Sequence, residues 1–274
     1  MFLRGLKFFF AAFAEFIFIL IIPQLMLKRE RQAYILHQVN VHNKVLCTNL
    51  CLDINVSDDT IRRDLHELAE EGKIIKIHGG AISNSFHKTN AHGEQVYSYV
   101  KKGIIAQKAA SLIKDGMYVL TGGGTTIIEL AKALPEHLHA TFITGSILAM
   151  MEYANHPSID VIALGDKISK NSKITIGPDA IAQIKRIKSD LCFLGINAID
   201  IEYGVSDNDW DVVQMKRAMI ESSKKTVCLT ISEKINSLQP IQICNLQKID
   251  ILITELQPDD PVLKPYADAG ITVV

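Results

Sequence analysis

The stretch Val56–Ala81, VSDDTIRRDLHELAEEGKIIKIHGGA, decides the fold of the N-terminal part of this chain. Ser57 is a residue type that caps helix N-termini with its hydroxyl. Asp58 and Asp59 follow in the first turn, where carboxylates complement the helix dipole. Gly72 is of the type that ends helices. The stretch therefore predicts a helix that starts after Ser57 and stops near Gly72.

The apolar residues of this helix fall on one face. Ile61, Leu65 and Leu68 recur at spacings of four and three, which predicts that they are buried. Two adjacent arginines, Arg62 and Arg63, then lie on other faces, about 100° apart around the helix. At most one of the two is expected to point squarely at a ligand that lies along the helix.

The surrounding segments complete a recognisable motif. Residues 28–39 and 45–53 predict two helices upstream, and Ile54–Val56 a turn. Downstream, Lys73–Ser83 alternates apolar and polar residues and turns at two glycines, which predicts a two-stranded ribbon. Three short helices and a ribbon make a winged helix-turn-helix.

In a helix-turn-helix, the N-terminal half of the second helix of the motif enters the major groove of DNA. An arginine there can grip a guanine edge or a phosphate through its bidentate fork. Lys76 and His78 on the ribbon are expected to touch the DNA backbone or the minor groove. The alternative interpretation is an ordinary solvated helix face, and the overall formal charge of −1 gives no electrostatic signature of a nucleic-acid binder.

After a polar segment, strands and helices alternate to the end of the chain. Strands are expected at 117–121, 140–143, 160–164, 190–194, 226–229, 249–253 and 271–274, with helices at 125–134, 147–155, 178–187, 211–222 and 261–269. Continuous β-branched runs separated by helices predict a mainly parallel sheet that is covered on both faces. The fold class is therefore an α/β main domain preceded by a small winged helix-turn-helix domain.

Small polar loops follow several of these strands. The loop Thr121–Thr126, TGGGTT, leads directly into a helix, and its free N–H groups favour an anion such as phosphate. Ligands of parallel sheets bind beyond the carboxyl ends of the strands, where these loops converge. The candidate effector-binding residues are Gly123, Gly124, Thr125, Thr126, Thr144, Ser146, Asn197, Asp207, Lys216 and Lys234.

The N-terminal stretch resembles the DNA-binding domain of the DeoR family of bacterial transcriptional regulators. The family signature V-S-x-x-T-I-R-R-D-L, followed by H-G-G-A in the wing, matches more than twenty contiguous positions. The resemblance implies that operator DNA is the partner. The candidate DNA-binding residues are Ser57, Thr60, Arg62, Arg63, His66, Lys76 and His78.

The C-terminal part, from about Ile104 to Val274, resembles the sensor domain of the same family, which is related in fold to ribose-5-phosphate isomerase. The matching pieces are GTTIIELAKAL, ITIGPDA, DLCFLGINAID, VVQMKRAMIESS and LTISEK. The resemblance implies a repressor of a carbohydrate-metabolism operon that responds to a phosphorylated sugar. Two departures concern the effector: Gly122 and Gly123 replace the family's D-S or D-x before Gly124, and its D-G-I-D becomes Asn197–Asp200.

An enzyme and a membrane-tethered regulator are the two alternative functional classes. A sugar-phosphate isomerase or deaminase needs a carboxylate base near a carbon-bound proton, for which Asp200, Asp207, Asp209 and Asp211 are candidates. The lysine- and glycine-rich catalytic loop of the related isomerases has no counterpart here, so we expect no catalytic residues. A membrane-tethered regulator is the other alternative.

The expected domains are an N-terminal extension at 1–27, the winged helix-turn-helix at 28–84, a linker at 85–103 and the effector-sensing domain at 104–274. The extension is apolar but short for a span of ~20 residues, and it contains Glu15. It is a membrane anchor, an interfacial helix or the product of a wrongly assigned start. We expect the last, a cytoplasmic location and no membrane partner.

Five cysteines without a dense framework indicate a reducing compartment. Cys47 and Cys51 with His37 and His42 match no known zinc spacing, so neither a metal nor a cofactor is expected. Since two helix-turn-helix units usually bind two half-sites, a homo-oligomer is expected.

Overall fold

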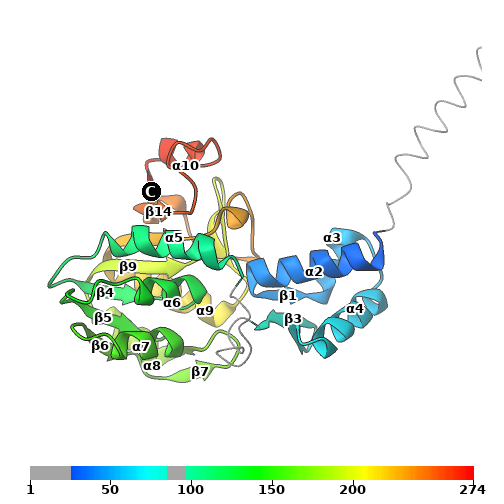
Figure 1. Cartoon of the computed structure of the whole chain (residues 1–274), viewed down its shortest axis with the longest axis horizontal. Coiled ribbons are helices and arrows are strands. Elements are labelled where there is room, and N and C mark those ends of the chain that lie inside the picture. The colour runs from blue at the N-terminus through cyan, green and yellow to red at the C-terminus, as the bar shows by residue number, and fades with distance from the viewer. Residues whose placement is uncertain (1–25, 85–96) are drawn as a thin grey trace, which may run out of the picture. The chain divides into compact units, whose positions relative to one another are not determined.

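The computed structural model describes residues 26–84 and 97–274 (Figure 1). The predictions for the extension, and most of those for the linker, lie outside the described residues. The described chain forms two compact units. The N-terminal unit holds the residues up to Val39 and Lys44–Ser83, and the C-terminal unit holds Asn40–Asn43 and the residues from Asn84 onward. In the part of the chain that is described, no helix is long and apolar enough to cross a membrane.

The described residues of the N-terminal unit form three helices and a three-stranded antiparallel sheet. The helices are α2 (Lys28–His42), α3 (Cys47–Ile54) and α4 (Asp58–Glu70), and the strands are β1 (Lys44–Leu46), β2 (Ile74–Ile77) and β3 (Gly80–Ser83), in the order β1-β3-β2. The predicted ribbon is β2 and β3. The three helices and this ribbon together form the winged helix-turn-helix.

Strand β1 was not predicted, because residues 45–53 were interpreted as one helix. Val45 pairs with Ala81 of β3, so the helix starts only at Cys47. Gly80 makes this pairing possible: a Cβ atom there would lie 2.0 Å from the carbonyl oxygen of Val45. The third strand therefore depends on a contact between residues far apart in the sequence.

The core of the N-terminal unit confirms the predicted buried face of α4. Ile61 and Leu65 are fully buried and Leu68 nearly so, and they pack with Ile35 and Val39 of α2. Burying such a side chain contributes roughly 1.5–3 kcal/mol. The spacing of apolar residues thus fixes which face of α4 remains exposed.

The C-terminal unit is built on a seven-stranded sheet in which every pair of neighbours is parallel. Its order is β15-β14-β12-β9-β4-β5-β6, and the strands are β4 (Tyr118–Thr121), β5 (Thr141–Thr144), β6 (Asp160–Ala163), β9 (Ser189–Gly195), β12 (Ser223–Leu229), β14 (Ile251–Ile253) and β15 (Thr272–Val273). This confirms the predicted α/β class.

Helices cover both faces of this sheet. The helices are α5 (Tyr99–Ala110), α6 (Thr125–Lys132), α7 (Ile147–Ala154), α8 (Pro178–Lys185), α9 (Trp210–Glu221) and α10 (Lys264–Asp268). Val119 of β4 belongs to the core that α5, α6 and α7 cover, whereas its neighbour Leu120 belongs to the core with α8 and α9. Alternate strand residues thus serve two separate cores, which is why the strands are apolar throughout.

Several elements were not predicted. Strands β7 (Lys167–Ser169) and β8 (Ile174–Ile176) form a hairpin, and β10 (Ala198–Asp200), β11 (Gly204–Asp207) and β13 (Ile241–Cys244) form a small antiparallel sheet. These strands are only three or four residues long, so their periodicity is too short to detect. Helix α5 begins inside the segment expected as linker, where its N-terminal turn exposes Tyr99 and Val100.

Candidate functional site

Helix α4 begins as the sequence predicts. The Oγ atom of Ser57 accepts a hydrogen bond from the N–H of Thr60 at 3.3 Å and lies 2.9 Å from the Thr60 hydroxyl. Asp58 and Asp59 occupy the first turn. Ser57 and Thr60 thus set where α4 starts, and only a part of their hydrogen-bonding capacity remains for a ligand.

A buried ion pair joins α4 to α2. Asp64 is 2% exposed, and its carboxylate accepts hydrogen bonds from Nε and Nη2 of Arg31, the latter at 3.2 Å. Gln32 donates to Glu67 at 2.7 Å one turn further along. These contacts fix the rotation of α4 about its own axis, and with it the direction of its exposed side chains. Sequence reasoning missed them because Asp64 resembles a solvated helix residue.

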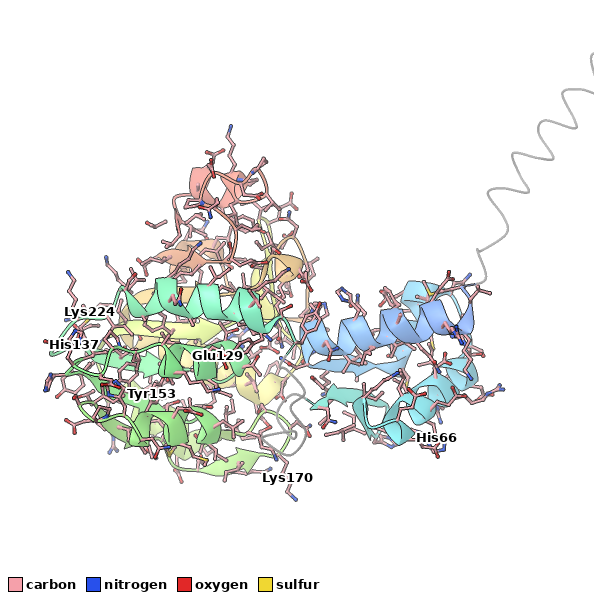
Figure 2. The ribbon with its side chains drawn as sticks, viewed as in Figure 1. His66, Glu129, His137, Tyr153, Lys170 and Lys224 are labelled. Atoms are coloured by element: carbon pink, nitrogen blue, oxygen red, sulfur yellow. The ribbon has the colours of Figure 1, made fainter. Side chains whose placement is uncertain are left out.

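The exposed face of α4 meets the ribbon at one hollow. Asp59, Arg62, Arg63, His66 and Lys76 line it, and we call this set the helix–ribbon surface. Four predicted DNA-binding residues thus lie together, three of them permanently cationic side chains. Figure 2 labels His66 on the outer side of α4. The hollow is a place where a polyanion can lie across both elements.

The two arginines differ in their contacts. The Nε atom of Arg62 lies 2.5 Å from Oδ2 of Asp58, whereas the Nε atom of Arg63 donates to the carbonyl oxygen of Asp59 at 3.3 Å. One N–H group of Arg62 is therefore already paired with a neighbouring carboxylate. His78 lies at the exposed tip of the ribbon and does not line the hollow.

In the C-terminal unit, the glycine-rich loop lies where the order of the strands in the sheet reverses. From β4 the chain proceeds to β5 and β6 on one side, whereas β9 and β12 lie on the other. The loop follows β4 at this switch point, which is where α/β sheets bind ligands. Gly124 has a φ of +114°, and the loop ends in α6 with Thr125 at its first position.

The close packing of the loop explains two of its glycines. A Cβ atom at Gly123 would lie 2.5 Å from Cγ2 of Ile174 in β8. Gly124 needs a positive φ, which favours glycine. Gly123 therefore allows β8 to pack against the loop.

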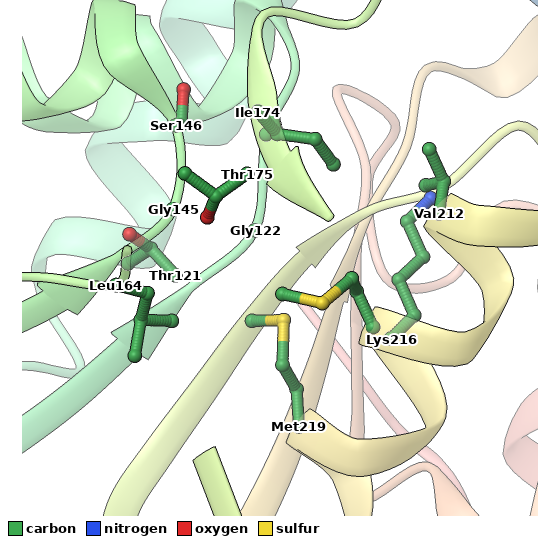
Figure 3. Close-up of a pocket in the computed structure, with 12 residues that line it drawn as sticks. Thr121, Gly122, Gly145, Ser146, Leu164, Ile174, Thr175, Val212, Lys216 and Met219 are labelled. Carbon is green, nitrogen blue, oxygen red and sulfur yellow. The ribbon is translucent and has the colours of Figure 1, made fainter. Parts of the chain in front are cut away.

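A small crevice opens beside this loop, with a cavity volume of about 20 Å³ (Figure 3). Its lining combines a polar wall with an apolar one and consists of Thr121, Gly122, Gly123, Gly145, Ser146, Leu164, Ile174, Thr175, Val212, Met215, Lys216 and Met219. We call this set the switch-point crevice. Of the predicted effector residues, Gly123, Ser146 and Lys216 line it.

The remaining predicted residues lie around the crevice rather than in its lining. They are Gly124, Thr125, Thr126, Thr144, Asn197, Asp207 and Lys234. Thr144 donates to the carbonyl oxygen of Thr121 at 3.1 Å and accepts from the N–H of Ser146. Thr144 therefore shapes the crevice through its neighbours. Met215, Met219 and Thr175 were missed, because the first two resemble core residues and the third lies in an unpredicted strand.

A chain of polar contacts runs outward from the buried pair of Lys216 and Asp207. The Nζ atom of Lys216 lies 2.6 Å from Oδ2 of Asp207, and Oδ1 of Asp207 accepts from Nδ2 of Asn197 at 2.7 Å. Lys234 donates to the carbonyl oxygen of Ile196 at 3.0 Å and to Oδ1 of Asn197 at 3.4 Å. Four predicted effector-binding residues from separate segments of the chain thus form one network.

The lysines of this region have lowered pKa values. Burial, together with the positive charges of Lys102 and Lys216, lowers the pKa of Lys234 to about 7. Burial also lowers the pKa of Lys102 to about 8. Three lysines thus share this region with the carboxylates of Asp207, Glu129 and Glu233.

A second cluster lies at the start of α5. The Nζ atom of Lys101 lies 2.6 Å from Oε1 of Glu233 and 3.2 Å from a carboxylate oxygen of Glu255. The Tyr97 hydroxyl donates to Glu233, and Lys102 donates to the carbonyl oxygen of Tyr97 at 2.6 Å. Glu233 immediately precedes Lys234 of the buried network. The cluster therefore ties the first turn of α5 to that network.

The described residues contain no group of histidine, cysteine and carboxylate side chains that suits a metal ion. Burial raises the pKa of both Cys47 and Cys51, so neither thiol favours the thiolate that binds metals.

Comparisons with known proteins fit this geometry. A family model of the DeoR-like helix-turn-helix domain matches residues 31–86, and one of the DeoR C-terminal sensor domain matches residues 98–256. The HTH-type transcriptional regulator GolR of Listeria innocua is 31% identical over 89% of this chain and 97% of its own. The glycerol-3-phosphate regulon repressor of Haemophilus influenzae is 32% identical over 75% of this chain and 81% of its own.

Among solved structures, ribose 5-phosphate isomerase A of Methanocaldococcus jannaschii aligns with 50% of this chain and 55% of its own. The sequence identity is 21% and the TM-score is 0.36.

Proposed function

Because this chain belongs to the DeoR family of DNA-binding transcriptional regulators, we propose that it represses genes of carbohydrate metabolism in response to a phosphorylated sugar or related metabolite. The observation that carries the effector part of the proposal is the position of the glycine-rich loop. It lies at the switch point of a parallel sheet, beside a buried lysine.

The proposed DNA-binding site is the helix–ribbon surface. Arg62 and Arg63 from α4 and Lys76 from the ribbon converge there, and the ion pair of Arg31 with Asp64 holds α4 in place. Glu70 and Glu71 lie at the other end of α4, away from the expected DNA, whereas Asp58 and Asp59 lie in its first turn. The proposal therefore rests on the three cationic side chains of the surface.

The proposed effector site is the switch-point crevice with its surrounding network. Free N–H groups of the loop and the start of α6 favour a phosphate group. Lys216 and Lys234 supply positive charge, and the methionines offer an apolar surface to a carbon skeleton. The name of the glycerol-3-phosphate regulon repressor of Haemophilus influenzae points to the same class of metabolite.

DNA binding and effector binding are proposed to be coupled through the start of α5. The Tyr97–Lys101–Glu233 cluster adjoins Lys234, and α5 is the first element after the segment that leads from the N-terminal unit. An effector that moves Lys234 would alter the restraint on this first turn. A coupling of about 1–3 kcal/mol is typical of such linked sites.

We propose that the C-terminal unit is a sensor and not an enzyme. Three of the four candidate catalytic carboxylates hold structural positions: Asp209 caps α9, Asp200 accepts from the N–H groups of Glu202 and Tyr203, and Asp207 pairs with Lys216. A turnover assay on ribose and hexosamine phosphates tests this point. Measurable conversion would overturn it.

The regulator is proposed to act in the cytoplasm as a homo-oligomer, since paired helix-turn-helix units bind paired half-sites. The central experiment is a gel shift on the DNA upstream of its own gene, run against a panel of sugar phosphates. We expect retardation at modest salt and a change of operator affinity with one member of the panel. No retardation would contradict the DNA-binding part, and retardation without any effector response would contradict the sensing part.

A further inference from the structure

One hydroxyl in the wall of the switch-point crevice has no hydrogen-bond partner among the described residues. It is Oγ1 of Thr175, in the middle of β8. The residue is only 6% exposed, so bulk water does not replace the missing partner. An unpaired buried hydroxyl costs roughly 1–3 kcal/mol. Valine would fill the same space without this cost.

The position of this hydroxyl is tightly fixed. The N–H of Thr175 donates to the carbonyl oxygen of Gly145 at 2.8 Å, which holds β8 beside the loop after β5. A Cβ atom at Gly145 would lie 2.3 Å from Oγ1 of Thr175. The hydroxyl therefore rests over the bare Cα atom of a glycine, at the wall of the crevice (Figure 3).

The other polar side chains of the lining already have partners within the fold. Thr121 accepts from the buried Tyr153 hydroxyl at 3.3 Å, and Ser146 accepts from the N–H of Ala149 at 3.3 Å as the cap of α7. Lys216 is paired with Asp207. Two further buried polar atoms lack partners among the described residues, in Ser172 and Gln214, but neither residue lines the crevice.

The opposite wall indicates what kind of group Thr175 meets. Val212, Met215 and Met219 of α9 line that side, and Figure 3 shows Lys216 and Met219 across from Thr175. A group that fits between these walls has hydrogen-bonding oxygen on one side and carbon-bound hydrogen on the other. The hydroxylated carbon skeleton of a sugar or polyol has this character, whereas a phosphate group has oxygen on every side.

We propose that Thr175 is a specificity-determining residue of the effector site, whose Oγ1 atom exchanges a hydrogen bond with a hydroxyl of the effector's carbon skeleton. This inference rests on the proposed function and deepens it. The phosphate lies at the glycine-rich loop, and Thr175 distinguishes among metabolites that carry the same phosphate. Ser146 supports it, because a hydroxyl that accepts from a backbone N–H still has its own proton to donate.

The test compares Thr175→Val with Thr175→Ser in the full-length protein. The probes are inorganic phosphate and the sugar phosphate that most stabilises the unmodified protein against heat. Thr175→Val should weaken sugar-phosphate binding by about ten- to a hundred-fold in calorimetry. Its binding of inorganic phosphate should be unchanged. Thr175→Ser retains the hydroxyl and should bind within about threefold of the unmodified protein.

A second readout separates ligand contact from a structural role. Without ligand, Thr175→Val should melt at the same temperature as the unmodified protein or higher, because it removes an unpaired polar group. Ser172→Ala removes the other unpaired hydroxyl and should leave sugar-phosphate affinity unchanged.

Three results would overturn the inference. Equal sugar-phosphate affinity of Thr175→Val and the unmodified protein would show that Thr175 does not determine specificity. The proposed function would still stand. A lower melting temperature of ligand-free Thr175→Val would show that the hydroxyl serves the fold. If no sugar phosphate binds the unmodified protein, the proposed effector class fails and this inference fails with it.

Discussion

The Nζ atom of Lys216 lies 2.6 Å from Oδ2 of Asp207, and both side chains are buried. Burial raises the pKa of Asp207, but the attraction and hydrogen bond of Lys216 outweigh this effect, so the net pKa lies below the ordinary value. The carboxylate therefore stays ionised beside the switch-point crevice, and the pair stabilises the folded state at neutral pH. That contribution is lost as the pH falls through the lowered pKa of Asp207.

Lys216→Met should destabilise the protein by about 3–5 kcal/mol in urea denaturation, because it leaves the Asp207 charge buried without a partner. The matched control is Lys224→Met (labelled in Figure 2), which removes the exposed partner of Asp190 at 2.7 Å. That exposed pair should contribute no more than about 1 kcal/mol. Equal effects of the two substitutions would show that the Lys216 pair is not structurally important.

Effector affinity should fall as the pH rises through 7 to 8. Lys234 has a pKa of about 7, and Lys102 one of about 8, so both are increasingly neutral in this range. An anion favours the charged amines, and binding above these pKa values must therefore take up protons. The charged groups that set these values are Lys216, Asp207, Glu129 and Glu233. Calorimetry in buffers of different ionisation enthalpy measures the uptake.

Lys234→Met is the control for this pH dependence. It should bind the effector more weakly at pH 6.5 and should take up fewer protons on binding than the unmodified protein. If the unmodified protein bound its effector without proton uptake between pH 7 and 8, the lowered lysine pKa values would have no part in binding.

Arg62→Ala and Arg63→Ala should weaken operator binding in different ways. The arginine that contacts a base edge should cost about 1–3 kcal/mol and relax sequence specificity, whereas a phosphate contact should weaken all sequences alike. Lys73→Met is a charge-matched control, because Lys73 pairs with Glu71 at 2.7 Å and does not line the helix–ribbon surface. Gel shifts on operator and scrambled DNA measure both effects. A loss for Lys73→Met as large as for either arginine would contradict the assigned surface.

Glu233→Gln should uncouple operator binding from effector binding. The substitution removes the negative charge that holds Lys101 at 2.6 Å but keeps the size of the side chain. Operator affinity without effector should stay within about threefold of the unmodified protein. The change in operator affinity caused by the effector should shrink. Full retention of that change in a gel shift would exclude the cluster as the connection.

Gly123→Ala should abolish the effector response and leave operator binding intact. The added Cβ atom would lie 2.5 Å from Ile174, so β8 or the loop must shift where the two meet. Gly103→Ala is the control, because no atom lies within 4 Å of its added Cβ atom and alanine favours a helix interior by roughly 0.5–1 kcal/mol. Thermal stabilisation by sugar phosphates measures the response. A normal response in Gly123→Ala would place the effector elsewhere.

The sequence by itself determined the elements whose physical signals are local. Ser57 and the spacing of Ile61, Leu65 and Leu68 predicted the start and the buried face of α4, and the structure confirms both. The apolar strands also predicted a parallel sheet, because side-chain periodicity depends only on neighbours in the chain. The glycine-rich loop was likewise visible as a candidate anion site.

Tertiary structure alone decided which distant residues meet. The ion pair of Arg31 with Asp64 spans two helices, and the network of Lys216, Asp207 and Asn197 joins α9 to strand β11 and to the turn after β9. Thr175 became a candidate only because β8 packs against Gly145 and leaves its hydroxyl unpaired among the described residues. Burial, hydrogen-bond satisfaction and shifted pKa values are properties of such surroundings, and a one-dimensional pattern does not contain them.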